Sequence, residues 1–327
     1  MQNNMTGKKT GLKNSMLSFL RSYNCSLLIA LIVLCAIMAF LSPYFLTMNN
    51  FMNIGLAASV TGTMAAGLTV YMLMGALELS QYATSALCGT FLGVLMTSMG
   101  CNVWIGILGA LAMSILCGSV NAILLTVGRI PPIIVTLGTM NVYRACAYIL
   151  TEARNLPLTD PVLRFIGQGK ILGIPTSMVV MLLAFFIAWF VLKYTTFGRQ
   201  VYAVGANPRA AHLSGINVDR TRFIGMLCAA FASGVAGILG VGQNMTAIPA
   251  SGVGSEIDIT TSVLVGGLGL TGGKGNIGGV FLGMMILMVI NNGMTLLSIQ
   301  SYYQQLVRGL VLLLAVLIDT VRGGGFK

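Results

Sequence analysis

The sequence predicts an all-α polytopic membrane protein with about ten transmembrane helices. Of its 327 residues, 56% are hydrophobic and only 8% are charged, whereas a soluble domain carries about 25% charged residues. Five long runs contain no charged side chain, and each approaches or exceeds the roughly 20 apolar residues that one membrane span requires. These runs are 25–41, 51–77, 79–128, 223–255 and 276–307.

These runs, together with the largely apolar stretches between and after them, contain ten segments that could each cross a bilayer. Residues 25–321 then form one membrane domain, preceded by a basic segment (1–24) and followed by a short tail (322–327). Since no small-residue cleavage site follows the first run, we expect a retained helix rather than a signal peptide. The predicted spans are 25–42, 51–75, 81–100, 103–127, 131–150, 177–194, 223–245, 257–271, 277–298 and 302–321.

Ten crossings would place both ends of the chain on one side of the membrane. That side would carry most of the 18 basic residues, opposed only by Asp219 and Asp319. The positive-inside rule therefore predicts that both termini are cytoplasmic. The net charge of +11 is explained by this topology and by anionic lipid headgroups, so no nucleic-acid partner is expected. The basic residues are Lys8, Lys9, Lys13, Arg21, Arg129, Lys274, Arg322, Lys327 and those within 193–222.

The sequence contains no pattern that predicts catalysis or a metal site. The seven cysteines are scattered singly, without a C-x-x-C pair, and most are expected to fill space within helices. Neither H-E-x-x-H nor G-x-S-x-G occurs, and the single histidine, His212, has no carboxylate pattern beside it. We therefore expect a protein that is not an enzyme and that holds no cofactor of its own.

The predicted cytoplasmic loop 195–222 should contain one short, well-capped helix. Asn207 is a good N-cap residue, Pro208 suits the first helical position, and Gly215 suits a left-handed C-cap. A helix of about two turns is too short to be stable alone in water. It therefore either docks on a partner or packs as an ordinary loop helix on the membrane domain. Its members between the caps are Arg209, Ala210, Ala211, His212, Leu213 and Ser214.

The glycine-rich stretch 266–279 resembles a phosphate-binding loop only superficially. The pattern G-x-x-x-x-G-K-[ST] fails at Leu268, where glycine is required, and at Gly275, where serine or threonine is required. Since no other phosphate loop occurs, ATP and magnesium must be bound by another protein. The glycines either allow close helix packing or form a gate on a transport route. The residues concerned are Gly266, Gly267, Gly272, Gly273 and Lys274.

Polar side chains inside apolar spans are costly and are candidates for a substrate pathway. Glu78 is interpreted as the only acid within a span, either functional or paired with Arg144 or Arg308. Neutral amides suit a sugar, which offers many hydroxyl groups, although several could simply join neighbouring helices. The candidates are Glu78, Ser80, Gln81, Asn121, Asn141, Arg144, Gln243, Asn244, Asn291 and Asn292, with Gln304, Gln305 and Arg308 as further polar residues.

Three stretches resemble the permeases of ribose-type ABC importers. They are TTFGRQVYAVGANPRAAHLSGINV (195–218), GSEIDITTSVLVGGLGLTGGKGNIGGVFLG (254–283) and YYQQLVRGLVLLLAV (302–316). Glu78 stands where that family usually has Asp in G-x-D-L-S, Arg209 where many members have Glu, and EIDITTS where ELDAIAA is common. The changes at Glu78 and in EIDITTS lie at plausible pathway positions, so they bear on the substrate rather than on the architecture.

This resemblance implies a sugar importer permease of the bacterial cytoplasmic (inner) membrane. It implies a fold like that of the vitamin B12 importer, a homodimer of permeases, an ATPase on the coupling helix and an extracytoplasmic sugar-binding protein. An ion-coupled secondary transporter is the alternative, and it would be expected to carry several intramembrane acids. A membrane-embedded enzyme is disfavoured because no catalytic set occurs in the sequence.

Overall fold

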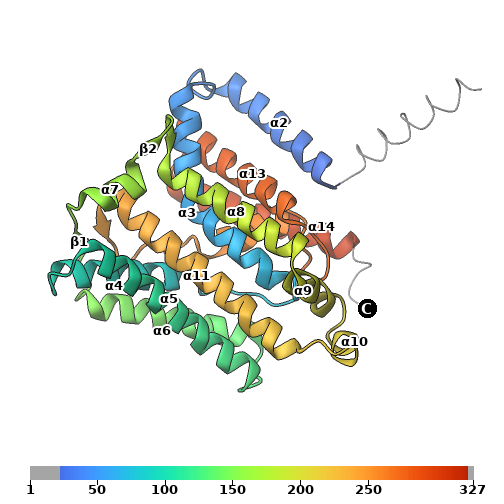
Figure 1. Ribbon diagram of the computed structural model, residues 1–327. Coiled ribbons are helices and arrows are strands. Elements are labelled where there is room, and N and C mark those ends of the chain that lie inside the picture. The colour runs from blue at the N-terminus through green and yellow to red at the C-terminus, as the bar shows by residue number, and fades with distance from the viewer. Residues whose placement is uncertain (1–22, 323–327) are drawn as a thin grey trace, which may run out of the picture.

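The computed structural model describes residues 23–322, which form a bundle of helices (Figure 1). Residues 1–22 and 323–327, with Lys8, Lys9, Lys13, Arg21 and Lys327, lie outside the described residues, as do the side chains of Asp319 and Arg322. The helices are α2 (Tyr23–Leu41), α3 (Met48–Met72), α4 (Gln81–Thr97), α5 (Val103–Thr126), α6 (Pro132–Leu150), α7 (Pro161–Gln168), α8 (Thr176–Tyr194), α9 (Thr196–Ala206), α10 (Pro208–Leu213), α11 (Val218–Asn244), α12 (Glu256–Val265), α13 (Ile277–Leu296) and α14 (Ser301–Arg322).

Seven helices in this described part are long and apolar enough to cross a membrane: α2, α3, α5, α6, α8, α11 and α13. The predicted all-α, multi-pass class is therefore confirmed. Three other predicted spans are shorter or less apolar, since α4 has 17 residues, α12 has ten, and the apolar part of α14 is Ser301–Leu317. Ten residues of α-helix rise about 15 Å, half of a hydrocarbon core of about 30 Å.

The predicted span 257–271 stops early because its glycines leave helical geometry. Gly266 caps α12, and Gly267 has φ +87°, in the left-handed region that a side chain rarely adopts. A Cβ at Gly266 would lie 2.5 Å from the Val280 Cα, so α13 approaches the backbone directly. The chain therefore continues from 266 to 276 as a loop.

The bundle has two distinct ends, visible in Figure 1. The α7 end carries two small antiparallel sheets that the sequence did not predict. In one, β1 (Leu156–Pro157) pairs with β4 (Thr246–Ala247), and in the other β2 (Lys170–Ile171) pairs with β3 (Ile174–Pro175). The α10 end carries α9, α10, the start of α2 and the end of α14.

Helices α3 and α11 lie at the centre of the core. Most of α3 is buried, and it packs against α8, α11, α12 and α13. Small residues allow this approach, since a Cβ at Gly67 would lie 2.4 Å from the Ala232 Cβ. The outer helices instead expose large apolar side chains such as Phe40 and Leu108. An apolar outer surface around a packed core is the arrangement expected of a protein embedded in lipid.

Candidate functional site

Glu78 lies in the non-helical break between α3 and α4. It is only 3% exposed, and its Oε1 accepts hydrogen bonds from the Ser80 backbone N–H at 2.8 Å and from the Ser80 hydroxyl. Its second oxygen, Oε2, is buried without a hydrogen-bond partner among residues 23–322. Burying an unpaired polar atom is costly. One carboxylate oxygen therefore stabilises the break through its hydrogen bonds. Burial of the other oxygen costs desolvation free energy that no hydrogen bond offsets.

Ser80 connects this break to α5 and α6. Asn121 of α5 donates from Nδ2 to the Ser80 hydroxyl oxygen at 3.1 Å, and the Tyr143 hydroxyl of α6 donates to Asn121 Oδ1 at 2.9 Å. Gln81, which begins α4, is 2% exposed, and neither polar atom of its amide has a partner in the described chain. The structure thus joins Glu78, Ser80 and Asn121. It adds Tyr143, which nothing in the sequence distinguishes from a core tyrosine.

The alternative that Glu78 pairs with Arg144 or Arg308 is wrong. Arg144 Nη2 lies 3.7 Å from Glu256 Oε1, and Arg308 Nη1 lies 2.8 Å from Asp258 Oδ2. Both acids lie in the first turn of α12. Arg144 reaches this turn from α6, and Arg308 reaches it from α14. Glu78 is therefore not the only acid within the helical bundle, because Asp258 is 6% exposed. We call Arg144, Glu256, Asp258 and Arg308 the α12 ion-pair cluster.

Both arginines of this cluster also bind the segment that leads into α12. Arg144 Nη1 donates to the carbonyl oxygens of Pro249 at 2.9 Å and Ser251 at 2.6 Å. Arg308 Nη1 donates to the Ser255 hydroxyl at 3.2 Å. The cluster therefore ties α6, α12 and α14 together. The sequence signal that could have found it is the presence of two acids and two arginines in three otherwise apolar stretches.

Most of the other predicted pathway amides fall into two groups: some join neighbouring helices, and others bond only to their own helix. Asn292 and Asn50 exchange two amide hydrogen bonds, at 3.0 and 2.8 Å, and so join α13 to α3. Gln243 donates to the Ser59 hydroxyl at 2.7 Å and joins α11 to α3. Asn291 lies beside Asn292, with its Oδ1 buried and unpartnered within residues 23–322. Two exposed amides donate to carbonyls of their own helix: Asn141 to Leu137 and Asn244 to Gly240.

We expect Asn292→Leu to lower the free energy of unfolding by about 1–2 kcal/mol, because Asn50 Oδ1 then loses its donor between two helices, while Asn50 Nδ2 keeps its bond to the Phe45 carbonyl. The double variant Asn50→Leu/Asn292→Leu should recover part of the loss, since both polar groups are gone. Thermal unfolding of the purified protein in detergent measures both effects. A double variant as unstable as the sum of the two single variants would show that the amides do not interact.

The glycine loop 266–275 packs at the α10 end against helix α9 and the α3–α4 break. The Gly273 backbone N–H donates to the Leu73 carbonyl at 2.8 Å, at the start of the α3–α4 break. A Cβ at Gly205, in the last turn of α9, would lie 2.6 Å from the Gly273 nitrogen. The Tyr202 hydroxyl of α9 donates to the Gly275 carbonyl at 3.2 Å. Lys274 is exposed. The loop thus packs closely on both α9 and the α3–α4 break.

Helix α10 has the caps that the sequence predicted. Asn207 Oδ1 accepts from the Ala210 backbone N–H at 3.0 Å, and Gly215 adopts φ +83° just after the helix. Ala211 is 5% exposed and packs in the main core, so it holds α10 against the membrane domain. Leu213 is 81% exposed. The remaining members of the motif, Pro208, Arg209, Ala210, His212 and Ser214, are exposed as well.

A hollow of about 370 Å³ lies beside this helix. It is lined by His212 and by residues 215–219, including Asp219 at the start of α11. Asp219 Oδ2 pairs with Arg129 Nη2 at 3.2 Å, which joins α11 to the α5–α6 loop.

Helix α9, immediately before α10, was not predicted from the sequence. Its start is nonetheless marked by the N-cap Thr195, whose hydroxyl accepts from the Gly198 N–H at 3.1 Å.

The chain is similar to known transport proteins over most of its length. The family model described as branched-chain amino acid transport system / permease component matches residues 50–316. The ribose import permease protein RbsC of Escherichia coli (strain K12) is 39% identical over 297 residues, which cover 89% of this chain and 92% of RbsC. RbsC of Bacillus subtilis (strain 168) is 36% identical over 293 residues, 89% of this chain and 91% of that protein.

A relative named for a different sugar is also similar. The L-arabinose transport system permease protein AraH of Escherichia coli (strain K12) is 32% identical over 311 residues, 95% of this chain and 94% of AraH. No solved structure matches the chain. The resemblance to ribose-type importer permeases is thereby confirmed, and the family consists of transport components rather than enzymes. The chain belongs to the family of branched-chain amino acid transport system / permease components.

Proposed function

We propose that this chain is the membrane-spanning permease subunit of an ATP-binding cassette importer for a sugar, a pentose, a hexose or a related furanose. The observation that carries this proposal is the similarity to ribose and arabinose permeases, which covers about nine-tenths of this chain and of each relative. A permease hydrolyses no ATP itself, in keeping with the failed phosphate loop. ATP and magnesium belong to a separate ATPase subunit.

The proposed architecture is ten crossings in a fold like that of the vitamin B12 importer. The three additional crossings are α4, α12 and α14. Each of these helices is too short or too polar to be identified as a membrane span by length and composition alone. Helix α11 ends at the α7 end, where the Gln243 carbonyl accepts a hydrogen bond from Gln168 of α7. The glycine loop that follows α12 lies at the opposite, α10 end, where Gly273 contacts Leu73. Helix α12 and the glycine loop together therefore form one crossing. This arrangement supports a cytoplasmic α10 end that carries both termini.

The proposed partners follow from the two ends. Helix α10, exposed on all but its Ala211 face, is the coupling helix on which a cytoplasmic ATPase docks. The α7 end faces the extracytoplasmic sugar-binding protein. A second copy of the permease completes the pathway, which we place along α6, α12 and α14. The α12 ion-pair cluster joins these helices, and its arginines and acids can exchange hydrogen bonds with sugar hydroxyls.

The experiment is reconstitution of the permease with its ATPase in proteoliposomes. Adding the binding protein loaded with ribose or arabinose should stimulate ATP hydrolysis, and the unloaded binding protein should stimulate it less. Permease without the ATPase should show no hydrolysis above a mock preparation. If no sugar-loaded binding protein changes the hydrolysis rate, the proposed substrate class is wrong.

Glu78→Gln should leave folding near the parental level but reduce uptake. The glutamine carbonyl oxygen can still accept from Ser80, so the α3–α4 break keeps its hydrogen bonds. Only the buried charge is lost, and such charges within spans are usually functional. Glu78→Leu, which removes both hydrogen bonds, should also lower the free energy of unfolding by about 1–3 kcal/mol. Unchanged uptake by the Gln variant would show that transport does not require the negative charge of Glu78.

A further inference from the structure

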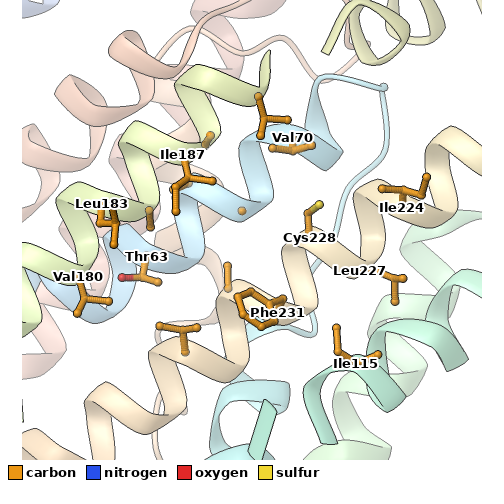
Figure 2. A pocket seen from close by; sticks show the side chains of 17 residues that line it. Thr63, Val70, Ile115, Val180, Leu183, Ile187, Ile224, Leu227, Cys228 and Phe231 are labelled. Atoms are coloured by element: carbon orange, nitrogen blue, oxygen red, sulfur yellow. The ribbon is translucent and has the colours of Figure 1, made fainter. Parts of the chain in front are cut away.

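An apolar groove lies on the outside of the bundle, between α3, α8 and α11. Its volume is about 460 Å³. Figure 2 shows Val180, Leu183 and Ile187 of α8 on one side, Ile224, Leu227 and Phe231 of α11 on the other, and Thr63 and Val70 of α3 between them. The Thr63 hydroxyl donates to the Ser59 carbonyl of its own helix at 2.7 Å. The lining therefore offers almost no free hydrogen-bonding group.

The packing of α3 and α11 sets the depth of this groove. Their close contact at Gly67 and Ala232 places two small residues in the lining. Ala66 and Ala184 are small as well, whereas Phe231 and Ile187 are large and exposed. We call these lining residues together the α3–α8–α11 groove. Its small inner residues and large rim form a channel shaped for a narrow apolar chain.

One end of the groove lies at the level of a membrane interface. Val191 is the last groove residue of α8, and the Lys193 ammonium group lies 5.1 Å from the Trp189 ring centre and 5.3 Å from that of Tyr194. Tryptophan, tyrosine and lysine gather where the hydrocarbon core meets the headgroups. The groove thus begins at the headgroup level of the α10 end and extends into the hydrocarbon.

The length of the groove distinguishes between two apolar occupants. Along α8 it runs from Val180 to Val191, a rise of about 16 Å, which is close to half of a hydrocarbon core of about 30 Å. A transmembrane helix of another protein would need a surface along the whole core. A lipid acyl chain occupies one leaflet only, so the length fits a lipid.

The charge at the interfacial end indicates which lipid. Arg220 is exposed and lies one turn before Ile224, on the same face of α11 as the groove residues. Helix α9, which packs against α3, α8 and α11, carries the exposed Arg199. Within residues 23–322, neither arginine forms an ion pair with an acidic side chain. Basic side chains at this level attract anionic headgroups.

We propose that the α3–α8–α11 groove binds one acyl chain of an anionic phospholipid from the leaflet at the α10 end, with its phosphate held by Arg199 and Arg220. The site would hold the lipid while α9 and α10 move, because α9 contacts all three groove helices. It requires no sugar and no ATPase, so it stands independently of the proposed function.

Cys228, which lines the groove, reports occupancy without any substitution. In detergent, phosphatidylglycerol at about ten times its dissociation constant should slow alkylation of Cys228 by about tenfold. Phosphatidylcholine should slow it less. Cys146, which is also half-buried but lies outside the groove, is the internal control and should react equally with or without lipid. Equal alkylation of Cys228 with and without phosphatidylglycerol would overturn the proposal.

Substitutions separate the two parts of the site. Ala184→Phe fills the groove and should abolish retention of phosphatidylglycerol in native mass spectrometry, whereas Ala36→Phe on the exposed face of α2 should not. Arg199→Gln/Arg220→Gln should keep a lipid bound but lose the preference for phosphatidylglycerol over phosphatidylcholine. If Ala184→Phe retains as much phosphatidylglycerol as the parent, the lipid binds elsewhere. A second protein chain protecting Cys228 in place of lipid would also contradict the proposal.

Discussion

Leu213→Glu is expected to abolish ATP-driven uptake while leaving the membrane domain folded. Leu213 ends α10 and is 81% exposed, so the change removes no contact of importance within the chain. In the proposed complex this side chain is buried against the ATPase. An unpaired carboxylate buried at an interface costs about 3–5 kcal/mol, which corresponds to an affinity lower by about a hundredfold to about four-thousandfold. Co-purification of the ATPase and uptake into proteoliposomes measure the effect.

The control for this variant must make the same change away from α10. Leu172 is 99% exposed and lies between β2 and β3 at the α7 end, so Leu172→Glu should retain the ATPase. Ala211→Glu is a poor test, because Ala211 is buried in the chain's own core and its substitution would disturb folding. If Leu213→Glu co-purifies the ATPase at the parental level and imports normally, α10 is an ordinary loop helix.

Arg308→Gln is expected to cause the largest loss of stability. It leaves the Asp258 carboxylate, whose side chain is 8% exposed, without its partner at 2.8 Å. Removing one member of a buried ion pair costs about 3–5 kcal/mol. The folded yield, the thermal unfolding temperature and uptake should therefore all fall. Arg308→Gln/Asp258→Asn should recover part of the stability, because no buried charge then remains unpaired.

The matched control is an exposed ion pair. Arg154 and Glu152 lie 3.5 Å apart, and both side chains are 78% exposed. Arg154→Gln should change the free energy of unfolding by no more than about 1 kcal/mol. Recovered stability without recovered uptake in the double variant would assign the α12 ion-pair cluster a task in transport. A single Arg308→Gln variant as stable as the parent would show that Asp258 does not depend on this arginine.

Features encoded by a few neighbouring residues could be predicted from the sequence. Helix α10 has its predicted caps because Asn207 and Gly215 act on backbone groups within three residues. The membrane class follows from composition alone. The segment between the predicted spans 131–150 and 177–194 did not reveal β1, because Leu156–Pro157 pairs with Thr246–Ala247, about ninety residues further along the chain. Strands of two residues carry no periodicity that a sequence can show.

Polar contacts between spans could not be predicted, because they depend on helix rotation. Arg144 and Arg308 were identified as unusual residues, but their partners Glu256 and Asp258 depend on how α6 and α14 face α12. The same holds for Asn50, which lies just before the predicted span 51–75 and which the structure pairs with Asn292. The early end of α12 depends on the left-handed φ of Gly267, which the sequence analysis did not predict, since its span continued to residue 271.

The most direct test of the central claim is sugar uptake by the permease in proteoliposomes under two sources of energy. We predict that uptake requires internal ATP, the ATPase and the sugar-binding protein together, and that it is unchanged when proton and sodium gradients are abolished. Uptake by the permease alone, driven by an ion gradient, would contradict the account and identify a secondary transporter.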